Sequence, residues 1–136
     1  MSVRELKDEF KQTNGNPEVK AKIRQIRQTR SRKRMMAAVP NASVVITNPT
    51  HFAVALKYER GMNAPICVAK GADLIARKIR EVATEHNIPI VENPPLARAL
   101  HATVEIDQEI APEHYQAVAE VIGYVMKLNR AVAARR

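Results

Sequence analysis

Hydrophobic positions are sparse in the N-terminal part of the chain and regular in the rest. Over residues 18–38 the spacing predicts a helix, but its apolar positions are too few to hold the whole helix against a core. A shorter helix is expected over residues 3–12, and Asn14-Gly15 provides a turn signal after it. We therefore expect residues 1–38 to form an extended helical arm.

Beyond Pro40-Asn41, short runs rich in β-branched residues predict strands, and longer amphipathic runs predict helices. The expected strands are 43–47, 52–58, 66–70 and 88–92, and the expected helices are 73–86, 94–100 and a last helix from residue 112. The last helix is expected to bury a stripe made of Tyr115, Val118, Ala119, Ile122, Val125 and Met126. This order indicates an α/β fold, with a small mixed four-stranded sheet flanked by helices. We expect a globular domain over 39–130 and a C-terminal tail over 131–136.

Positive charge is concentrated in the arm. The net charge of the chain is +8; residues 1–39 hold 11 basic and four acidic residues, whereas residues 40–136 hold 11 basic and 10 acidic residues. Residues 20–34 hold eight basic residues and no acidic one: Lys20, Lys22, Arg24, Arg27, Arg30, Arg32, Lys33 and Arg34. Such a stretch can lie on an anionic membrane surface, bind nucleic acid, or be a solvated helix face.

Several kinds of chemistry are disfavoured by the residues present. The four histidines and the single cysteine lack the spacing of a metal site, so we expect no metal and no cofactor. Cys67 lies within an apolar strand, where an inert buried thiol is the usual case. No apolar run approaches the roughly 20 residues that a membrane-spanning helix needs.

Asn48-Pro49-Thr50-His51 lies between two predicted strands and offers specific chemistry. Deamidation of an asparagine normally begins when the next backbone nitrogen attacks the side-chain carbonyl, but proline has no backbone N–H and closes that route. The side-chain nitrogen of Asn48 can instead attack the backbone carbonyl of Asn48. A succinimide then forms, the nitrogen of Pro49 leaves, and the main chain is cut.

This reaction needs help from the fold. A tight turn with Pro49 at its second position would bring the reacting atoms together, and a hydrogen-bond donor near the Asn48 carbonyl oxygen would stabilise the oxyanion. His51 or Thr50 could carry the proton between the two nitrogens. The chain contains two further Asn-Pro pairs, Asn16-Pro17 and Asn93-Pro94, but neither precedes Thr-His or lies between two strands.

The residues around this turn resemble the FlhB/YscU family, the export-switch proteins of flagellar and injectisome type III secretion systems. The resemblance rests on residues 44–47, the four-residue motif 48–51, and residues 52–58, 64–65, 68–72, 79–81 and 94–100. The arm resembles the segment that joins the family's membrane part to its cytoplasmic domain. The residues after the motif look more like the flagellar branch than the injectisome branch.

The resemblance implies a single-turnover self-cleavage rather than a multiple-turnover enzyme. Asn48 would be the nucleophile, Pro49 the leaving group, and Thr50 and His51 the assisting neighbours, and the pieces 1–48 and 49–136 would stay together. The longer protein would be a multi-pass membrane protein, with this chain at the cytoplasmic face of the bacterial inner membrane. It would switch export from rod and hook subunits to filament subunits.

The implied partners are other export-gate membrane proteins, a hook-length ruler protein, the export substrates and the inner-membrane surface. This setting favours the membrane surface over nucleic acid as the partner of the basic arm. Export substrates are expected to dock on small exposed apolar residues, for which Ala64, Pro65, Ala119 and Ile122 are candidates. The helix pattern by itself favours a place in the core for Ala119 and Ile122. The rival hypotheses are a basic nucleic-acid-binding module and an adaptor domain in which the Asn-Pro turn is only a turn.

Overall fold

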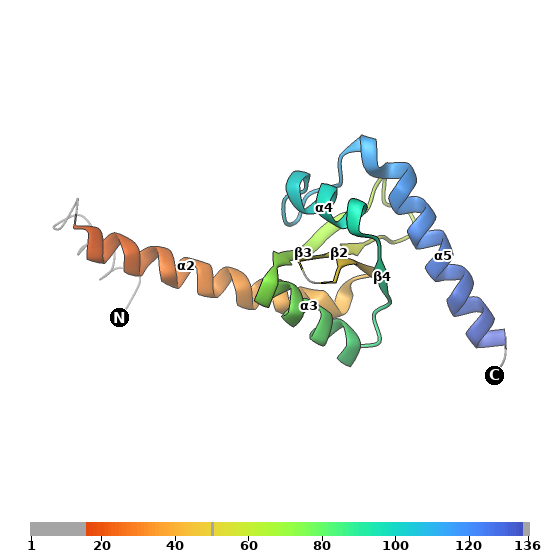
Figure 1. The fold of residues 1–136 in the computed structure, drawn as a ribbon, viewed down its shortest axis with the longest axis horizontal. Coiled ribbons are helices and arrows are strands. Elements are labelled where there is room, and N and C mark those ends of the chain that lie inside the picture. The colour runs from red at the N-terminus through yellow and green to blue at the C-terminus, as the bar shows by residue number, and fades with distance from the viewer. Residues whose placement is uncertain (1–15, 50, 135–136) are drawn as a thin grey trace. The chain divides into compact units, whose positions relative to one another are not determined.

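The computed structural model describes residues 16–49 and 51–134 (Figure 1). The chain divides into two compact units, Met1–Arg34 and Met35–Arg136. The helix expected over residues 3–12 lies outside the described residues, and so does Thr50.

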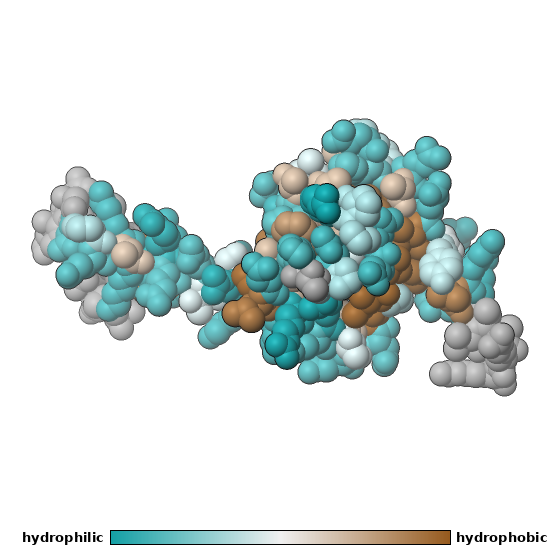
Figure 2. Space-filling model, viewed as in Figure 1, coloured by the Kyte–Doolittle hydropathy of each residue, from teal (hydrophilic) through white to brown (hydrophobic). Residues whose placement is uncertain are grey.

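Helix α2 (Pro17–Ala38) accounts for the described part of the first unit and continues into the second. Its start is capped by Asn16, whose side-chain oxygen accepts hydrogen bonds from the backbone N–H groups of Glu18 (2.9 Å) and Val19 (3.4 Å). Pro17 suits the first helical position because its missing N–H would have no partner there. The surface of this helix is mostly hydrophilic (Figure 2), as expected for a segment with few apolar residues.

The second unit contains a mixed four-stranded sheet. Its strands are β1 (Val44–Asn48), β2 (Phe52–Lys57), β3 (Ile66–Ala72) and β4 (Ile90–Glu92). The strand order is β3-β2-β1-β4, so β1 lies inside the sheet between antiparallel β2 and parallel β4. A register shift between Ala55 and Leu56 interrupts the pairing of β2 with β3.

Helices cover both faces of this sheet (Figure 1). The remaining elements are η1 (Val39–Asn41), α3 (Asp73–Glu85), α4 (Pro94–Thr103), η2 (Pro112–His114) and α5 (Tyr115–Ala134). One face packs against α4 and α5 through side chains such as Val44 and Ile46, and the other packs against η1 and α3 through Val45 and Ala53. Because both faces are buried, β1 is apolar at successive positions rather than alternating.

The structure confirms the predicted fold class, a mixed four-stranded sheet flanked by helices with a long N-terminal helix. The predicted stripe of α5 is partly wrong. Val118, Ile122 and Val125 are buried as expected and Val121 joins them, whereas Tyr115 is 40% and Met126 52% exposed. Ala119 is also exposed. The face that packs is rotated towards Val121, which leaves one edge of the predicted stripe in solvent.

Gly71 allows α3 to start close to the end of β3, and a side chain at this position should be costly. A Cβ atom on Gly71 would lie 2.2 Å from Cγ2 and 2.7 Å from Cβ of Ile75. We expect Gly71→Ala to lower the free energy of unfolding by about 1–3 kcal/mol, the usual cost of overpacking. Gly123→Ala is the matched control, because nothing lies within 4 Å of the added Cβ. Urea unfolding measures both, and equal midpoints for Gly71→Ala and the wild type would contradict the prediction.

Candidate functional site

The Asn48-Pro49 pair lies in a tight turn between β1 and β2. Asn48 is the last residue of β1 and pairs with Phe52, the first residue of β2. The backbone N–H of His51 donates a hydrogen bond of 2.9 Å to the carbonyl oxygen of Asn48. Pro49 is therefore at the second position of a turn closed by its own hydrogen bond, where the fixed φ of proline is favoured. The carbonyl that would be attacked already accepts a hydrogen bond.

Helix α3 contacts two further carbonyl groups of this turn. The Arg80 side chain donates through Nη1 to the carbonyl oxygen of Pro49. The backbone N–H of Asp73, the first residue of α3, donates to the carbonyl oxygen of His51 at 3.0 Å. Asp73 has a left-handed φ of 51°, a conformation that aspartate tolerates better than most residues. The turn is thus held by both a side chain and the backbone of one helix.

The strand that leads to Asn48 is fixed on its other edge by β4. Val45 donates through its backbone N–H to Pro89 at 2.9 Å, and Asn93 donates to the carbonyl oxygen of Thr47 at 2.9 Å. Thr47 is buried, with an exposed fraction of 3%. The residue before Asn48 is therefore fixed from both sides, which limits the freedom of the Asn48 backbone.

An aromatic contact lies beside the turn. The rings of Phe52 and His101 are stacked with centroids 4.5 Å apart, and the centroid of Phe52 is 6.2 Å from that of His51. Burial, with a smaller contribution from the charge of Lys70, lowers the pKa of His101 below its usual value. The Lys70 ammonium also donates to the carbonyl oxygen of His101 at 3.2 Å. Burial and the charge of Lys70 both favour the neutral form of His101.

The other two Asn-Pro pairs have a different geometry. Asn16 and Asn93 both precede a helix, and both use the side-chain oxygen to cap it: Asn93 accepts from the backbone N–H of Leu96 at 3.3 Å. The structure gives the side chain of Asn48 no hydrogen bond to any described residue. Of the three asparagines, Asn48 therefore differs from Asn16 and Asn93 in that its side chain does not cap a helix.

Cys67 and possible metal ligands offer no alternative centre within the described part of the chain. Cys67 is fully buried, as expected, and burial raises the pKa of its thiol to about 11. A protonated thiol inside the core is a poor nucleophile. Among residues 16–49 and 51–134, no group of three or more histidine, cysteine, aspartate or glutamate side chains could hold a metal ion.

The proposed docking residues do not form an exposed apolar surface. Ala64, Pro65 and Ile122 are buried, and Ala119 is exposed. Ile122 packs in the core between α5 and the sheet, which is the alternative that its helical spacing allowed. The exposure on which this prediction depended is therefore found at Ala119 alone.

The basic stretch of the arm is exposed throughout. The side chains concerned are Lys20, Lys22, Arg24, Arg27, Arg30, Arg32, Lys33 and Arg34. Within the described part of the chain, no helix combines the length and the apolar character needed to cross a bilayer.

Sequence reasoning missed Arg80 and Asp73 as neighbours of the turn. Both are distant from it along the chain, and only the packing of α3 on the sheet brings them to it. Arg80 belongs to one of the segments that carry the family resemblance, but a resemblance of this kind assigns no contact. The sequence of an amphipathic helix that carries both arginines does not distinguish Arg80 from Arg77.

Comparisons with known proteins agree on one family. A family model described as the FlhB HrpN YscU SpaS Family matches residues 1–125. The flagellar biosynthetic protein FlhB of Escherichia coli is 53% identical over 131 residues, which are 96% of this chain and 34% of that protein. FlhB of Bacillus subtilis is 50% identical over 133 residues, 97% of this chain and 37% of that protein. The chain spans about a third of the length of these curated relatives.

Solved structures share the fold. The crystal structure of the cytoplasmic domain of FlhB from Shewanella putrefaciens matches with a TM-score of 0.73 and 50% identity, over 76% of this chain and 81% of that one. A mutated EscU C-terminal domain matches with a TM-score of 0.64 and 29% identity, over 67% of this chain and 92% of that one. The higher identity to FlhB places this chain with the flagellar members.

Proposed function

This chain belongs to the FlhB HrpN YscU SpaS family, and from that premise we propose that it is the cytoplasmic part of a flagellar protein-export component that cuts its own backbone between Asn48 and Pro49. The observation that carries the proposal is the hydrogen bond from the His51 N–H to the carbonyl oxygen of Asn48. It points a donor at the atom on which negative charge develops when that carbonyl is attacked.

The cut proceeds in one chemical sequence. The Asn48 Nδ2 attacks the backbone carbonyl carbon of Asn48, and a tetrahedral centre forms with its negative charge on the carbonyl oxygen. The bond to the nitrogen of Pro49 then breaks, and a proton lost from Nδ2 ends on that nitrogen. The products are a C-terminal succinimide on residue 48 and a free secondary amine on residue 49. Water later opens the ring.

The turn supplies two kinds of help. The ladder on both edges of β1 and the closed turn restrict the torsions around Asn48, so the two reacting groups meet without a large loss of entropy. The N–H of His51 stabilises the oxyanion. His51 and Thr50 are the candidates for carrying the proton between the two nitrogens.

The biological consequence that we propose is a change in export specificity, from rod and hook subunits to filament subunits. Its partners would be other export-gate membrane proteins, a hook-length ruler protein and the exported subunits. The longer protein would be anchored in the bacterial inner membrane, with this chain at the cytoplasmic face. The exposed basic stretch of α2 would then lie against anionic lipid headgroups through charge alone, because that helix has little apolar surface to insert.

Mass spectrometry of the purified wild-type chain tests the proposal. We expect two fragments, residues 1–48 and 49–136, with part of the smaller one lighter by one water because its end is a succinimide. Hydrolysis of that ring yields C-terminal asparagine together with its isomer that carries the amide on the main-chain carbonyl. A contaminating protease yields asparagine only. A chain that stays intact at neutral pH would overturn self-cleavage and favour a plain adaptor domain.

A further inference from the structure

We propose that Arg80 is a positioning residue for the backbone cut, because its guanidinium holds the leaving side of the Asn48–Pro49 peptide. The inference deepens the proposed self-cleavage and rests on it. The contact on which it is based is the hydrogen bond from Arg80 Nη1 to the carbonyl oxygen of Pro49, which joins α3 to the turn. This oxygen belongs to the residue whose nitrogen is expelled.

Holding this one oxygen fixes the leaving residue almost completely. The pyrrolidine ring already locks the φ of Pro49, so ψ is its remaining soft torsion, and ψ sets the direction of its carbonyl. On the attacking side, Asn48 is fixed by its pairing with Phe52 and by the hydrogen bond from His51. The Arg80 contact thus fixes the last free torsion next to the scissile bond and keeps the turn in its reactive geometry.

Helix α3 provides a rigid support for this side chain. Ala76, Ile79 and Ala83 are buried against the sheet at 3%, 0% and 0% exposure, and Arg80 is half-buried beside them. The first residue of the helix, Asp73, holds the carbonyl of His51. The turn and Arg80 are therefore carried by elements that pack on the same core, which suits a group that must be placed accurately.

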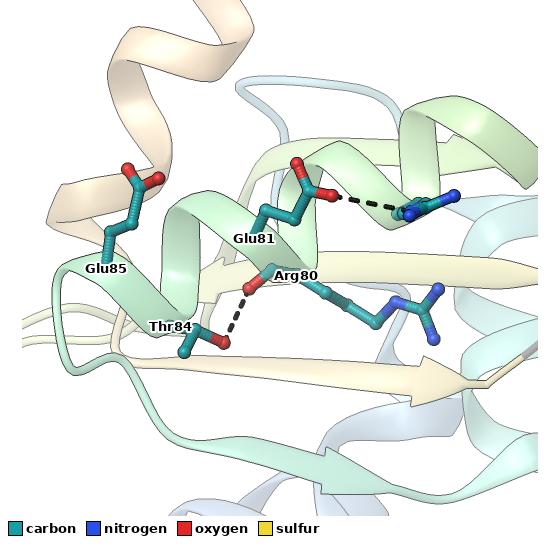
Figure 3. A pocket seen from close by; sticks show the side chains of 5 residues that line it. Arg80, Glu81, Thr84 and Glu85 are labelled. Carbon is teal, nitrogen blue, oxygen red and sulfur yellow. Dashed lines mark hydrogen bonds and ion pairs between the residues drawn. The ribbon is translucent and has the colours of Figure 1, made fainter.

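The charge of Arg80 is directed at the turn rather than at a carboxylate. Among the described residues Arg80 forms no ion pair, whereas Arg77, one turn earlier, pairs with Glu81 at 3.4 Å. Arg80 is one of the residues that line a pocket on α3. In Figure 3 its side chain extends away from Thr84 and Glu85. A cation bound one peptide unit from the developing oxyanion also favours the transition state electrostatically.

Cleavage kinetics of Arg80 variants test the inference. Chains are labelled in a short pulse of cell-free synthesis and followed on gels, since cutting begins as soon as the chain folds. We expect Arg80→Ala to cut about tenfold more slowly or worse, the loss expected for one charge-assisted hydrogen bond, and Arg80→Lys to retain part of the rate. Arg77→Ala is the matched control on the same helix; its side chain is 71% exposed and its ion pair is a surface one, so its rate should equal that of the wild type.

Two further measurements separate positioning from a general loss of structure. Guanidinium ion at millimolar concentration, too low to shift the melting temperature, should speed the cutting of Arg80→Ala and leave Arg77→Ala unchanged. If the wild type is cut and Arg80→Ala is cut at the same rate, the inference is overturned and the proposed function still stands. Slow cutting accompanied by a lower melting temperature and no rescue would also overturn it. An uncut wild type would refute the proposed function itself.

Discussion

Asn48→Ala is expected to leave one intact chain under conditions in which the wild type is cut completely. The substitution removes the only nitrogen that can close the five-membered ring, and no other group replaces it. The fold should survive, because Asn48 is the last residue of β1 and contributes to the sheet through backbone atoms that alanine retains. The mass spectrum should therefore show the full chain and no 49–136 fragment, and circular dichroism should match that of the wild type.

The chain supplies its own matched controls for this prediction. Asn16→Ala and Asn93→Ala remove the asparagine from the other two Asn-Pro pairs, at a cost of about 1 kcal/mol of helix capping each. Both variants should be cut between residues 48 and 49 as completely as the wild type, and no variant should be cut at residues 16 or 93. Cutting of Asn48→Ala between residues 48 and 49 would show that another agent breaks the bond.

The tight turn at the site could be predicted from the sequence because it depends on neighbouring residues. Proline after Asn48 closes one reaction and leaves another, and apolar runs on both sides of the motif indicate a hairpin. The contacts of Arg80 and Asp73 could not be predicted, since they depend on the way α3 packs on the sheet after a crossover. The helix expected over residues 94–100 is present as α4, but the hydrogen bond by which Asn93 caps its start was not predicted.

Which small or apolar residues are buried was harder to predict than which segments form helices and strands. Small residues such as Ala64 and Pro65 fit either a docking surface or a close contact between elements, and composition does not separate the two. On α5 the hydrophobic stripe is wider than the strip that packs in the core, so the edge that carries Tyr115 and Met126 remains exposed. The sequence therefore predicts that the helix packs, but its rotation about its own axis is set by the shape of the sheet.

The two fragments of the cut protein are expected to remain associated in native buffer. Fragment 1–48 would contribute β1, which is bonded to β2 on one edge and to β4 on the other. Val44, Val45 and Ile46 are completely buried, and so is Val39 before the strand. Each such side chain contributes roughly 1.5–3 kcal/mol when buried. Together with the ladder hydrogen bonds, these contacts should hold the fragments at micromolar concentration, and size-exclusion chromatography should give a single peak that contains both.

Thermal unfolding distinguishes native association through β1 from non-specific association of the fragments. The cut protein is a complex of two chains, so its unfolding releases two molecules and its melting temperature should rise with protein concentration. The uncut Asn48→Ala chain unfolds as one molecule, and its melting temperature should not depend on concentration. It should also be the higher of the two in dilute solution, because the intact turn keeps β1 tethered next to its place in the sheet. Two peaks in native buffer, or equal melting curves at all concentrations, would contradict the prediction, since either result would mean that β1 is not held by the packing described for it.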